Sequence, residues 1–261
     1  MDYVNFGNTG LKVSRLCLGC MTYGDPNWRS WVLDEAASKP LVEAALDAGI
    51  NFFDTANMYS LGASERVVGS ILRGTGVPRD QIVVATKVYN AMGEGPNDRG
   101  LSRKHIMESI NGSLRRLQTD YVDLYQAHRY DHETPLEETM TAFADIVRQG
   151  KALYVGISSY LEEDTRKAQA ILKDMGVPLL IHQPSYSILN RWIEDDNTID
   201  ACGELGVGMI AFSPLAQGML TGKYNSGKAP ADSRIMLENY KWLGDRVLGD
   251  ESKLDKVRKL T

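Results

Sequence analysis

Four polar side chains of the types that could reduce a carbonyl group stand at or just after the ends of apolar segments. They are Asp54, Tyr59, Lys87 and His128. When a hydride reaches a carbonyl carbon, negative charge develops on the oxygen, so the site must supply a proton and stabilise that charge. We therefore expect a site for carbonyl reduction, provided that the fold brings these side chains together.

The four residue types divide this chemistry among them. The phenol of Tyr59 can donate the proton, but its ordinary pKa of about 10 makes it a weak acid at neutral pH. The Lys87 ammonium would favour the phenolate and lower that pKa. Asp54 would pair with the ammonium, which is costly to remove from water when unpaired. His128 would donate a hydrogen bond to the substrate oxygen and orient it.

Each residue alone also has a structural interpretation. Lys87 could be the solvated end of a strand, His128 could be structural, and Asp54 could cap the loop that follows it. Tyr59 alone indicates almost nothing. The catalytic interpretation depends on all four lying at the same end of consecutive structural units.

The elements around these residues predict an α/β fold. Seven short apolar segments alternate with segments of helical periodicity, which is typical of parallel strands joined by crossover helices. Each helical segment has one apolar stripe, so the helices should cover a sheet. A hairpin around residues 8–10 precedes the first strand. The strands are expected at 15–21, 51–56, 82–87, 122–128, 153–158, 179–183 and 208–213.

Two helix starts carry capping signals. Ser102 should cap one helix, with Leu101 and Ile106 in contact across the cap. Thr134 should cap another, with Pro135 at its first position. This arrangement predicts a (β/α)8 TIM barrel, in which residues at the carboxyl ends of the strands face the active site.

Several longer motifs resemble the aldo-keto reductase family. Segments 49–59 and 64–69 are similar to its first signature, and segments 117–128, 150–159 and 212–224 are similar to later ones. The resemblance covers essentially the whole chain. It implies an NADPH-dependent reductase of aldehydes or ketones with Asp54, Tyr59, Lys87 and His128 as its catalytic residues.

The likeness within the family changes along the chain. Residues 151–234 resemble bacterial L-glyceraldehyde 3-phosphate reductases, and residues 239–244 resemble potassium-channel β subunits. Two alternatives to an active enzyme therefore stay open. One is an NADPH-binding subunit that senses redox state, and the other is an inactive truncated or engineered scaffold of the same fold.

The resemblance also implies an NADPH site across the top of the barrel, without a glycine-rich Rossmann loop. Ser158, Ser159 and Gln183 would hold the nicotinamide carboxamide, with Tyr186 beneath the ring. The nicotinamide ribose would lie near Cys20 and Met21.

The other end of the cofactor would lie on a loop at 213–218. Its backbone N–H groups would hold the pyrophosphate, and Lys223 and Arg234 would add charge-assisted contacts. Taken alone, the loop could be an ordinary turn. Its residues are Ser213, Pro214, Leu215, Ala216, Gln217 and Gly218.

Aromatic residues near the same end could line the substrate mouth, or could simply pack the loops. They are Tyr23, Trp28, Trp31 and Tyr89. Arg129, next to His128, would suit an anionic or polar small-molecule carbonyl substrate.

Composition narrows the class of protein. The 29 Lys and Arg against 34 Asp and Glu give a net charge of −5, which offers no attraction for nucleic acid or an anionic membrane. No signal peptide and no long apolar run is found, so we expect a cytoplasmic protein. Cys17 and Cys20 form a weak metal motif that is better interpreted as buried thiols, so no metal is expected. A homo-oligomer is left open.

The strand count has a further consequence. A closed barrel of this kind needs eight strands, and we identify seven. After Arg234 only helix-like stretches follow, at 237–248 and 251–261. We therefore expect residues 1–261 to form a single barrel domain that lacks its eighth βα unit and holds the adenine end of NADPH loosely.

Overall fold

The computed structural model describes residues 1–237 and 240–260. The resemblance at 239–244 and the helical stretch at 251–261 each include a residue that lies outside this description. The chain forms two compact units. Unit 1 comprises Met1–Gln183 and Asn197–Ile210, and unit 2 comprises Pro184–Asp196 and Ala211–Thr261. The single domain expected from the sequence stays a prediction.

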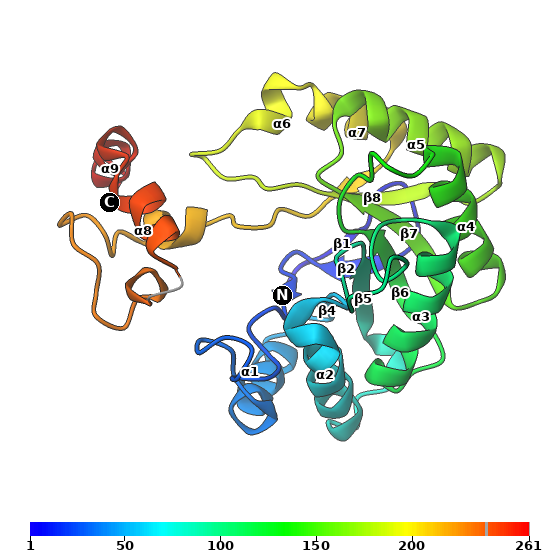
Figure 1. Cartoon of the computed structure of the whole chain (residues 1–261), viewed down its shortest axis with the longest axis horizontal. Coiled ribbons are helices and arrows are strands. Elements are labelled where there is room, and N and C mark those ends of the chain that lie inside the picture. Colours follow the sequence, from blue (N-terminus) through cyan, green and yellow to red (C-terminus); the bar gives the residue numbers. More distant parts are fainter. Residues whose placement is uncertain (238–239, 261) are drawn as a thin grey trace. The chain divides into compact units, whose positions relative to one another are not determined.

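Unit 1 contains a parallel sheet of seven strands in sequential order, which curls into a half-barrel (Figure 1). This confirms the predicted α/β barrel class. The strands are β3 (Leu18–Gly19), β4 (Phe52–Asp54), β5 (Val83–Val88), β6 (Val122–Ala127), β7 (Ala152–Ser158), β8 (Leu179–Gln183) and β9 (Gly208–Met209). The outermost strands β3 and β9 are shorter than predicted. In the described part of the chain each has a neighbour on one side only, so fewer backbone groups are held in the ladder.

Helices follow one another around the outside of this sheet (Figure 1). They are α1 (Glu35–Asp47), α2 (Ala63–Gly74), α3 (Arg103–Leu117), α4 (Leu136–Arg148), α5 (Glu162–Asp174) and α7 (Thr198–Leu205). The predicted hairpin is also confirmed, as β1 (Tyr3–Asn5) paired with β2 (Lys12–Ser14). Among the helices described, none is both long enough and apolar enough to cross a membrane.

One of the two predicted caps is correct. Ser102 accepts a hydrogen bond from the His105 backbone N–H and begins α3. The predicted Thr134 cap is wrong, because α4 has Pro135 at its N-cap and no side-chain cap. The Thr134 hydroxyl instead donates to Asp131 Oδ2 at 2.8 Å, and this bond orients the side chain toward Asp131.

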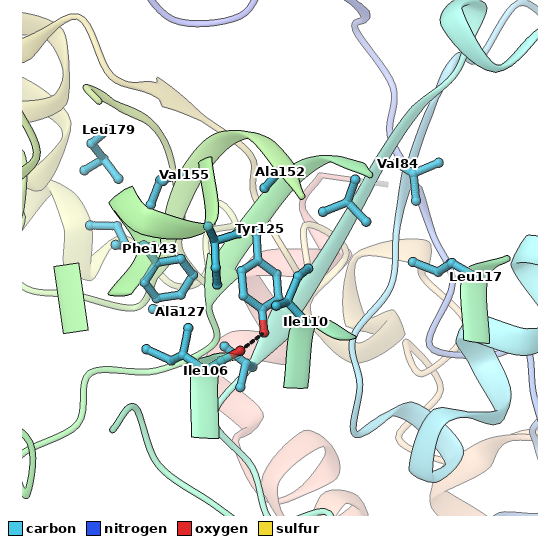
Figure 2. Close-up of a cluster of buried hydrophobic side chains, with 14 of the residues drawn as sticks. Val84, Ile106, Ile110, Leu117, Tyr125, Ala127, Phe143, Ala152, Val155 and Leu179 are labelled. Carbon is cyan, nitrogen blue, oxygen red and sulfur yellow. Dashed lines mark hydrogen bonds between the residues drawn. The ribbon is translucent and has the colours of Figure 1, made fainter. Parts of the chain in front are cut away.

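The two faces of the sheet bury different side chains. On the outer face, Tyr125 packs against Phe143 and donates its hydroxyl to the Ile106 carbonyl oxygen at 3.4 Å (Figure 2). On the inner face, Ala85 and Leu124 belong to a second buried cluster. Because successive residues of a strand point to opposite faces, the residues two positions further along each strand also face inward. Those residues are Lys87 and Gln126.

Unit 2 consists of short helices joined by loops. They are α6 (Trp192–Asp195), η3 (Ala216–Thr221), η4 (Arg234–Met236), α8 (Lys241–Leu248) and α9 (Glu251–Arg258). The predicted helical stretch at 251–261 corresponds to α9, whose Leu254 and Val257 are buried as expected. Leu260 was expected on the same stripe but is 62% exposed, because α9 ends before it.

Candidate active site

A buried ion pair joins the ends of β4 and β5. The Lys87 side chain has 0% exposure, and its Nζ donates to Asp54 Oδ2 at 2.5 Å and to the Thr55 carbonyl oxygen at 2.8 Å. The interpretation of Lys87 as a solvated strand end is therefore wrong. Burial opposes the ammonium, but the neighbouring Asp54 and Tyr59 outweigh it and raise the pKa of Lys87. Lys87 is thus a charged ammonium at neutral pH.

Gln126 holds the other oxygen of the same carboxylate. Its Nε2 donates to Asp54 Oδ1 at 3.0 Å, so both carboxylate oxygens are engaged inside the barrel. Asp54 therefore does not cap the loop after it. Sequence reasoning missed Gln126, although a signal was present. It lies two residues before His128 along the chain, and the period of a strand places them on the same side.

Tyr59 completes the contact with the ion pair. It lies in the short helix η1 (Tyr59–Gly62), and its hydroxyl oxygen lies 3.4 Å from Lys87 Nζ. Burial raises the pKa of Tyr59, and the Lys87 ammonium lowers it by a smaller amount. The sequence predicted the direction of the Lys87 effect but not the net result, because the burial of the phenol was unknown.

His128 lies beside Tyr59, with the two rings edge to face and their centroids 5.7 Å apart. Burial lowers the pKa of His128 well below its ordinary value, and the nearby charges of Lys87 and Arg129 act in the same direction. The imidazole is therefore neutral at physiological pH. Its Nδ1 lies 3.3 Å from Nδ2 of Asn90, a second residue that sequence reasoning missed. The structure thus brings the four predicted residues together in unit 1.

The three residues predicted to hold a carboxamide also lie together in unit 1. Ser158 donates its hydroxyl to the Gln183 carbonyl oxygen at 2.8 Å, and the Ser159 backbone N–H donates to the same oxygen at 3.3 Å. Ser159 has a positive φ of 59°, which is uncommon for a serine. Its Oγ accepts a hydrogen bond from Arg129 Nη1 at 2.6 Å. Arg129, the residue after His128 in the chain, therefore contacts Ser159.

The segment after β3 carries other predicted contacts. Cys20 is fully buried, and burial raises the pKa of its thiol, whereas Met21 is 38% exposed. Trp28 and Trp31 pack edge to face, with ring centroids 6.3 Å apart. This packing supports the structural interpretation of the two tryptophans, and their contact with a substrate stays a prediction.

The two remaining aromatic candidates are also held by the protein. Tyr23 of unit 1 is buried. The partly buried Tyr89 accepts a hydrogen bond on its carbonyl oxygen from the Gly100 backbone N–H at 2.7 Å. In unit 2, the Tyr186 hydroxyl donates to Glu194 Oε1 at 2.6 Å. Their predicted contacts with substrate or cofactor stay predictions.

The loop at 213–218 in unit 2 has an unusual backbone. Ser213, Ala216 and Gln217 have φ values of 56°, 48° and 59°, and Gly218 has a φ of 91°. Left-handed conformations at residues other than glycine are strained and cluster where backbone groups bind ligands. The φ of Gly218 favours glycine, and a Cβ atom there would lie 2.8 Å from Cε of Lys223, so the end of this lysine side chain lies against the loop.

A chain of polar side chains braces this loop. Arg234 Nη2 donates to Gln217 Oε1, and Gln217 Nε2 donates to Ser213 Oγ at 2.9 Å. Lys223 and Arg234 thus lie near a loop of strained backbone. Cationic side chains beside such a backbone are the kind of donors that an anion such as a phosphate prefers. By contrast, the described residues gather no group of three or more His, Cys, Asp or Glu side chains that could hold a metal ion.

A parallel half-barrel with a buried lysine–aspartate pair against a tyrosine is typical of enzymes whose site can donate a proton to a developing oxyanion. The sequence profile of the aldo/keto reductase family matches residues 15–249. This chain belongs to the aldo/keto reductase family. It is an oxidoreductase that acts on carbonyl groups of small molecules, and the family typically uses a nicotinamide cofactor.

Proteins of known name are similar along most of the chain. A probable voltage-gated potassium channel subunit beta from Oryza sativa subsp. japonica is 42% identical over 254 residues, covering 97% of this chain and 75% of that protein. L-glyceraldehyde 3-phosphate reductase from Escherichia coli K12 is 43% identical over 248 residues, covering 94% and 70%. Versiconal hemiacetal acetate reductase from Aspergillus parasiticus is 41% identical over 237 residues, covering 84% and 69%. The expected resemblance to the family and to two of its branches is confirmed.

Proposed function

We propose that the chain is a cytoplasmic enzyme that reduces an aldehyde or ketone to the alcohol with NADPH, with Tyr59 as the proton donor. One observation carries the proposal. Lys87 Nζ lies 2.5 Å from Asp54 Oδ2 and 3.4 Å from the Tyr59 hydroxyl oxygen. A buried ammonium so placed stabilises the phenolate that remains after Tyr59 gives up its proton.

The protein's part of the reaction follows from this geometry. A reduced nicotinamide supplies a hydride when it is bound. His128 donates a hydrogen bond to the carbonyl oxygen and orients the substrate. Tyr59 transfers its hydroxyl proton to the same oxygen as negative charge develops there. Asp54 keeps Lys87 charged and in place, and burial of the group keeps water from weakening these interactions.

We assign the cofactor's phosphate groups to the loop at 213–218 of unit 2. The strained backbone and the polar side chains that brace it support this assignment, together with Lys223 and Arg234. Lys223 and Arg234 would add charge-assisted contacts to the pyrophosphate, which NADPH and NADH share.

We assign the nicotinamide carboxamide to Ser158, Ser159 and Gln183 of unit 1. A carboxamide has both donors and acceptors, and two serine hydroxyls with a glutamine amide can match them. Cys20, Met21 and Tyr186 stay predicted contacts of the nicotinamide ribose and ring.

The substrate class proposed is a small carbonyl compound with an anionic or polar group. Arg129 supports this substrate class, because it follows His128 in the chain and its guanidinium can pair with a phosphate or carboxylate. The name of the bacterial relative, L-glyceraldehyde 3-phosphate reductase, describes such a substrate. We therefore propose this aldehyde as a second compound to test.

Two measurements on the parent chain test the proposal. NADPH is titrated by its fluorescence, and its oxidation is followed at 340 nm with 4-nitrobenzaldehyde and with L-glyceraldehyde 3-phosphate. Binding with turnover supports the reductase. Binding without turnover of any aldehyde would support a redox-sensing subunit instead, in keeping with the channel-subunit name of the rice relative. Failure to bind either NADPH or NADH would support an inactive scaffold.

A further inference from the structure

His128 can donate a hydrogen bond from only one of its ring nitrogens. The imidazole is neutral because burial and the charges of Lys87 and Arg129 disfavour the imidazolium. A neutral imidazole has one N–H, and the other nitrogen only accepts. The tautomer therefore decides which nitrogen can donate to a substrate.

Asn90 lies against the first of these nitrogens. Its side-chain Nδ2 is 3.3 Å from Nδ1 of His128. An amide NH2 group donates and does not accept, so this contact requires a lone pair on Nδ1. With the amide nitrogen facing Nδ1, the neutral ring carries its proton on Nε2.

The backbone around both residues keeps them next to each other. The His128 N–H donates to the Val88 carbonyl oxygen at 2.9 Å, which ties His128 to the chain just before Asn90. On the other side of Asn90, the Gly100 N–H donates to the Tyr89 carbonyl oxygen at 2.7 Å. These two hydrogen bonds fix the backbone of the loop that carries Asn90.

The carboxylate of Asp131 also connects the two loops. Asp131 Oδ2 accepts the Leu101 backbone N–H at 2.7 Å, and the same oxygen accepts the Thr134 hydroxyl. This joins the loop after β5 to the loop after β6, which carries His128 at its start. The contact between Asn90 and His128 is therefore built into the fold on both loops.

We propose that Asn90 is a positioning residue that holds His128 in the tautomer with its proton on Nε2, so that the neutral ring donates from Nε2 to the substrate's carbonyl oxygen. The role of this hydrogen bond in turnover rests on the proposed function. The tautomer itself does not, and it can be measured in the protein alone.

The tautomer is measured by long-range ¹H–¹⁵N correlation NMR on protein labelled with ¹⁵N-histidine. The chain has 4 histidines, so the His128 ring signals are assigned by their loss in His128→Gln. We expect an unprotonated Nδ1 and a protonated Nε2 in the parent, and a shifted Nδ1 signal in Asn90→Ala. A protonated Nδ1 in the parent, or an Nδ1 signal unmoved by Asn90→Ala, would overturn the proposal.

Asn90→Asp provides the opposite change at the same position. A carboxylate accepts, so we expect it to draw a proton onto Nδ1 and to raise the pKa of His128 against Lys87 and Arg129. The Nδ1 signal should become protonated, and kcat/KM should gain a pH-dependent limb that the parent lacks. A variant with the parent's tautomer and pH profile would show that residue 90 does not control the ring.

Kinetics connect the tautomer to the reaction. We expect Asn90→Ala to lower kcat about 10- to 100-fold, a part of what a positioned acid–base or hydrogen-bonding group contributes. The NADPH dissociation constant should stay within about twofold. Asn97→Ala is the matched control, because Asn97 is exposed in the same loop. An Asn90→Ala variant with the control's kcat would overturn the role in turnover, whereas a parent that shows the expected tautomer but no turnover would count against the proposed function alone.

Discussion

The carboxylate of Asp54 receives the ammonium of Lys87 at 2.5 Å, at a position where the lysine side chain has no exposed surface. An ion pair so deeply buried is a weak source of stability, because removing two charges from water offsets most of their attraction. Its value lies in keeping a fixed positive charge beside the Tyr59 hydroxyl. Substitutions in this group should therefore have separate effects on catalysis, on cofactor binding and on folding.

The hydroxyl of Tyr59 should be needed for chemistry and not for cofactor binding. Tyr59→Phe deletes the proton donor and keeps the ring, so we expect turnover to fall about 100-fold or more, the range for loss of a general acid. The NADPH dissociation constant from fluorescence titration should stay within about twofold of the parent's. A variant that keeps more than a third of the parent's kcat would show that another group supplies the proton.

Removing the lysine charge should harm both activity and stability. Lys87→Met leaves the buried Asp54 carboxylate without its ammonium, which should lower the free energy of unfolding by about 3–5 kcal/mol and abolish turnover. Urea denaturation measures the first effect and the 340 nm assay the second. Lys87→Met combined with Asp54→Asn removes both charges, so it should regain most of the lost stability and none of the turnover. A double variant no more stable than Lys87→Met would show that the lost stability does not come from an unpaired charge.

The sequence predicted the members of this site better than their contacts. Asp54, Lys87 and His128 could be grouped because parallel strands end at one edge of a sheet, and apolar segments mark where the strands end. Gln126 could not be paired with Asp54 in the same way. That contact depends on strand register, in which Gln126 lies opposite Lys87 on the neighbouring strand. Register is set by packing between segments far apart in the chain.

A local hydrogen bond explains another difference between the sequence prediction and the structure. Thr134 has the type and position of a helix cap, yet its hydroxyl bonds to Asp131. A sequence pattern does not indicate whether a nearby carboxylate will orient such a hydroxyl away from the start of the helix. The net shift in the pKa of Tyr59 could not be predicted for a related reason, since burial depends on the whole fold whereas proximity to Lys87 could be expected from the strand order.

The two cations of unit 2 should contribute to cofactor affinity. We expect Lys223→Ala and Arg234→Ala each to weaken NADPH binding by roughly 1–3 kcal/mol, the range for a hydrogen bond to a charged group. Turnover at saturating cofactor should change less. Lys228→Ala is the control, because Lys228 is an exposed lysine a few residues away. If all three variants bind NADPH with the parent's dissociation constant, this loop does not hold the phosphates.

The carboxylate of Asp131, which joins the loop after β5 to the loop after β6, should make stability depend on pH. Burial opposes the charge of Asp131, but bonds from the Thr134 hydroxyl and the Leu101 and Glu133 backbone N–H groups outweigh it and lower the pKa of Asp131. A carboxyl group whose pKa is lower in the folded state stabilises the fold above its unfolded pKa of about 3.9 and loses that effect as pH falls toward the folded value. Asp131→Asn should therefore reduce the free energy of unfolding by about 1–3 kcal/mol at pH 7.

The difference between the parent and Asp131→Asn is best followed by urea denaturation at several pH values from 7 down to about 3.5. It should be constant from pH 7 to about 5 and should shrink below about 4, because the parent's carboxylate is then being protonated. Asp120→Asn, which changes an exposed aspartate, should show no such trend. A difference that is the same at every pH would mean that the side-chain amide, and not the loss of charge, accounts for the destabilisation.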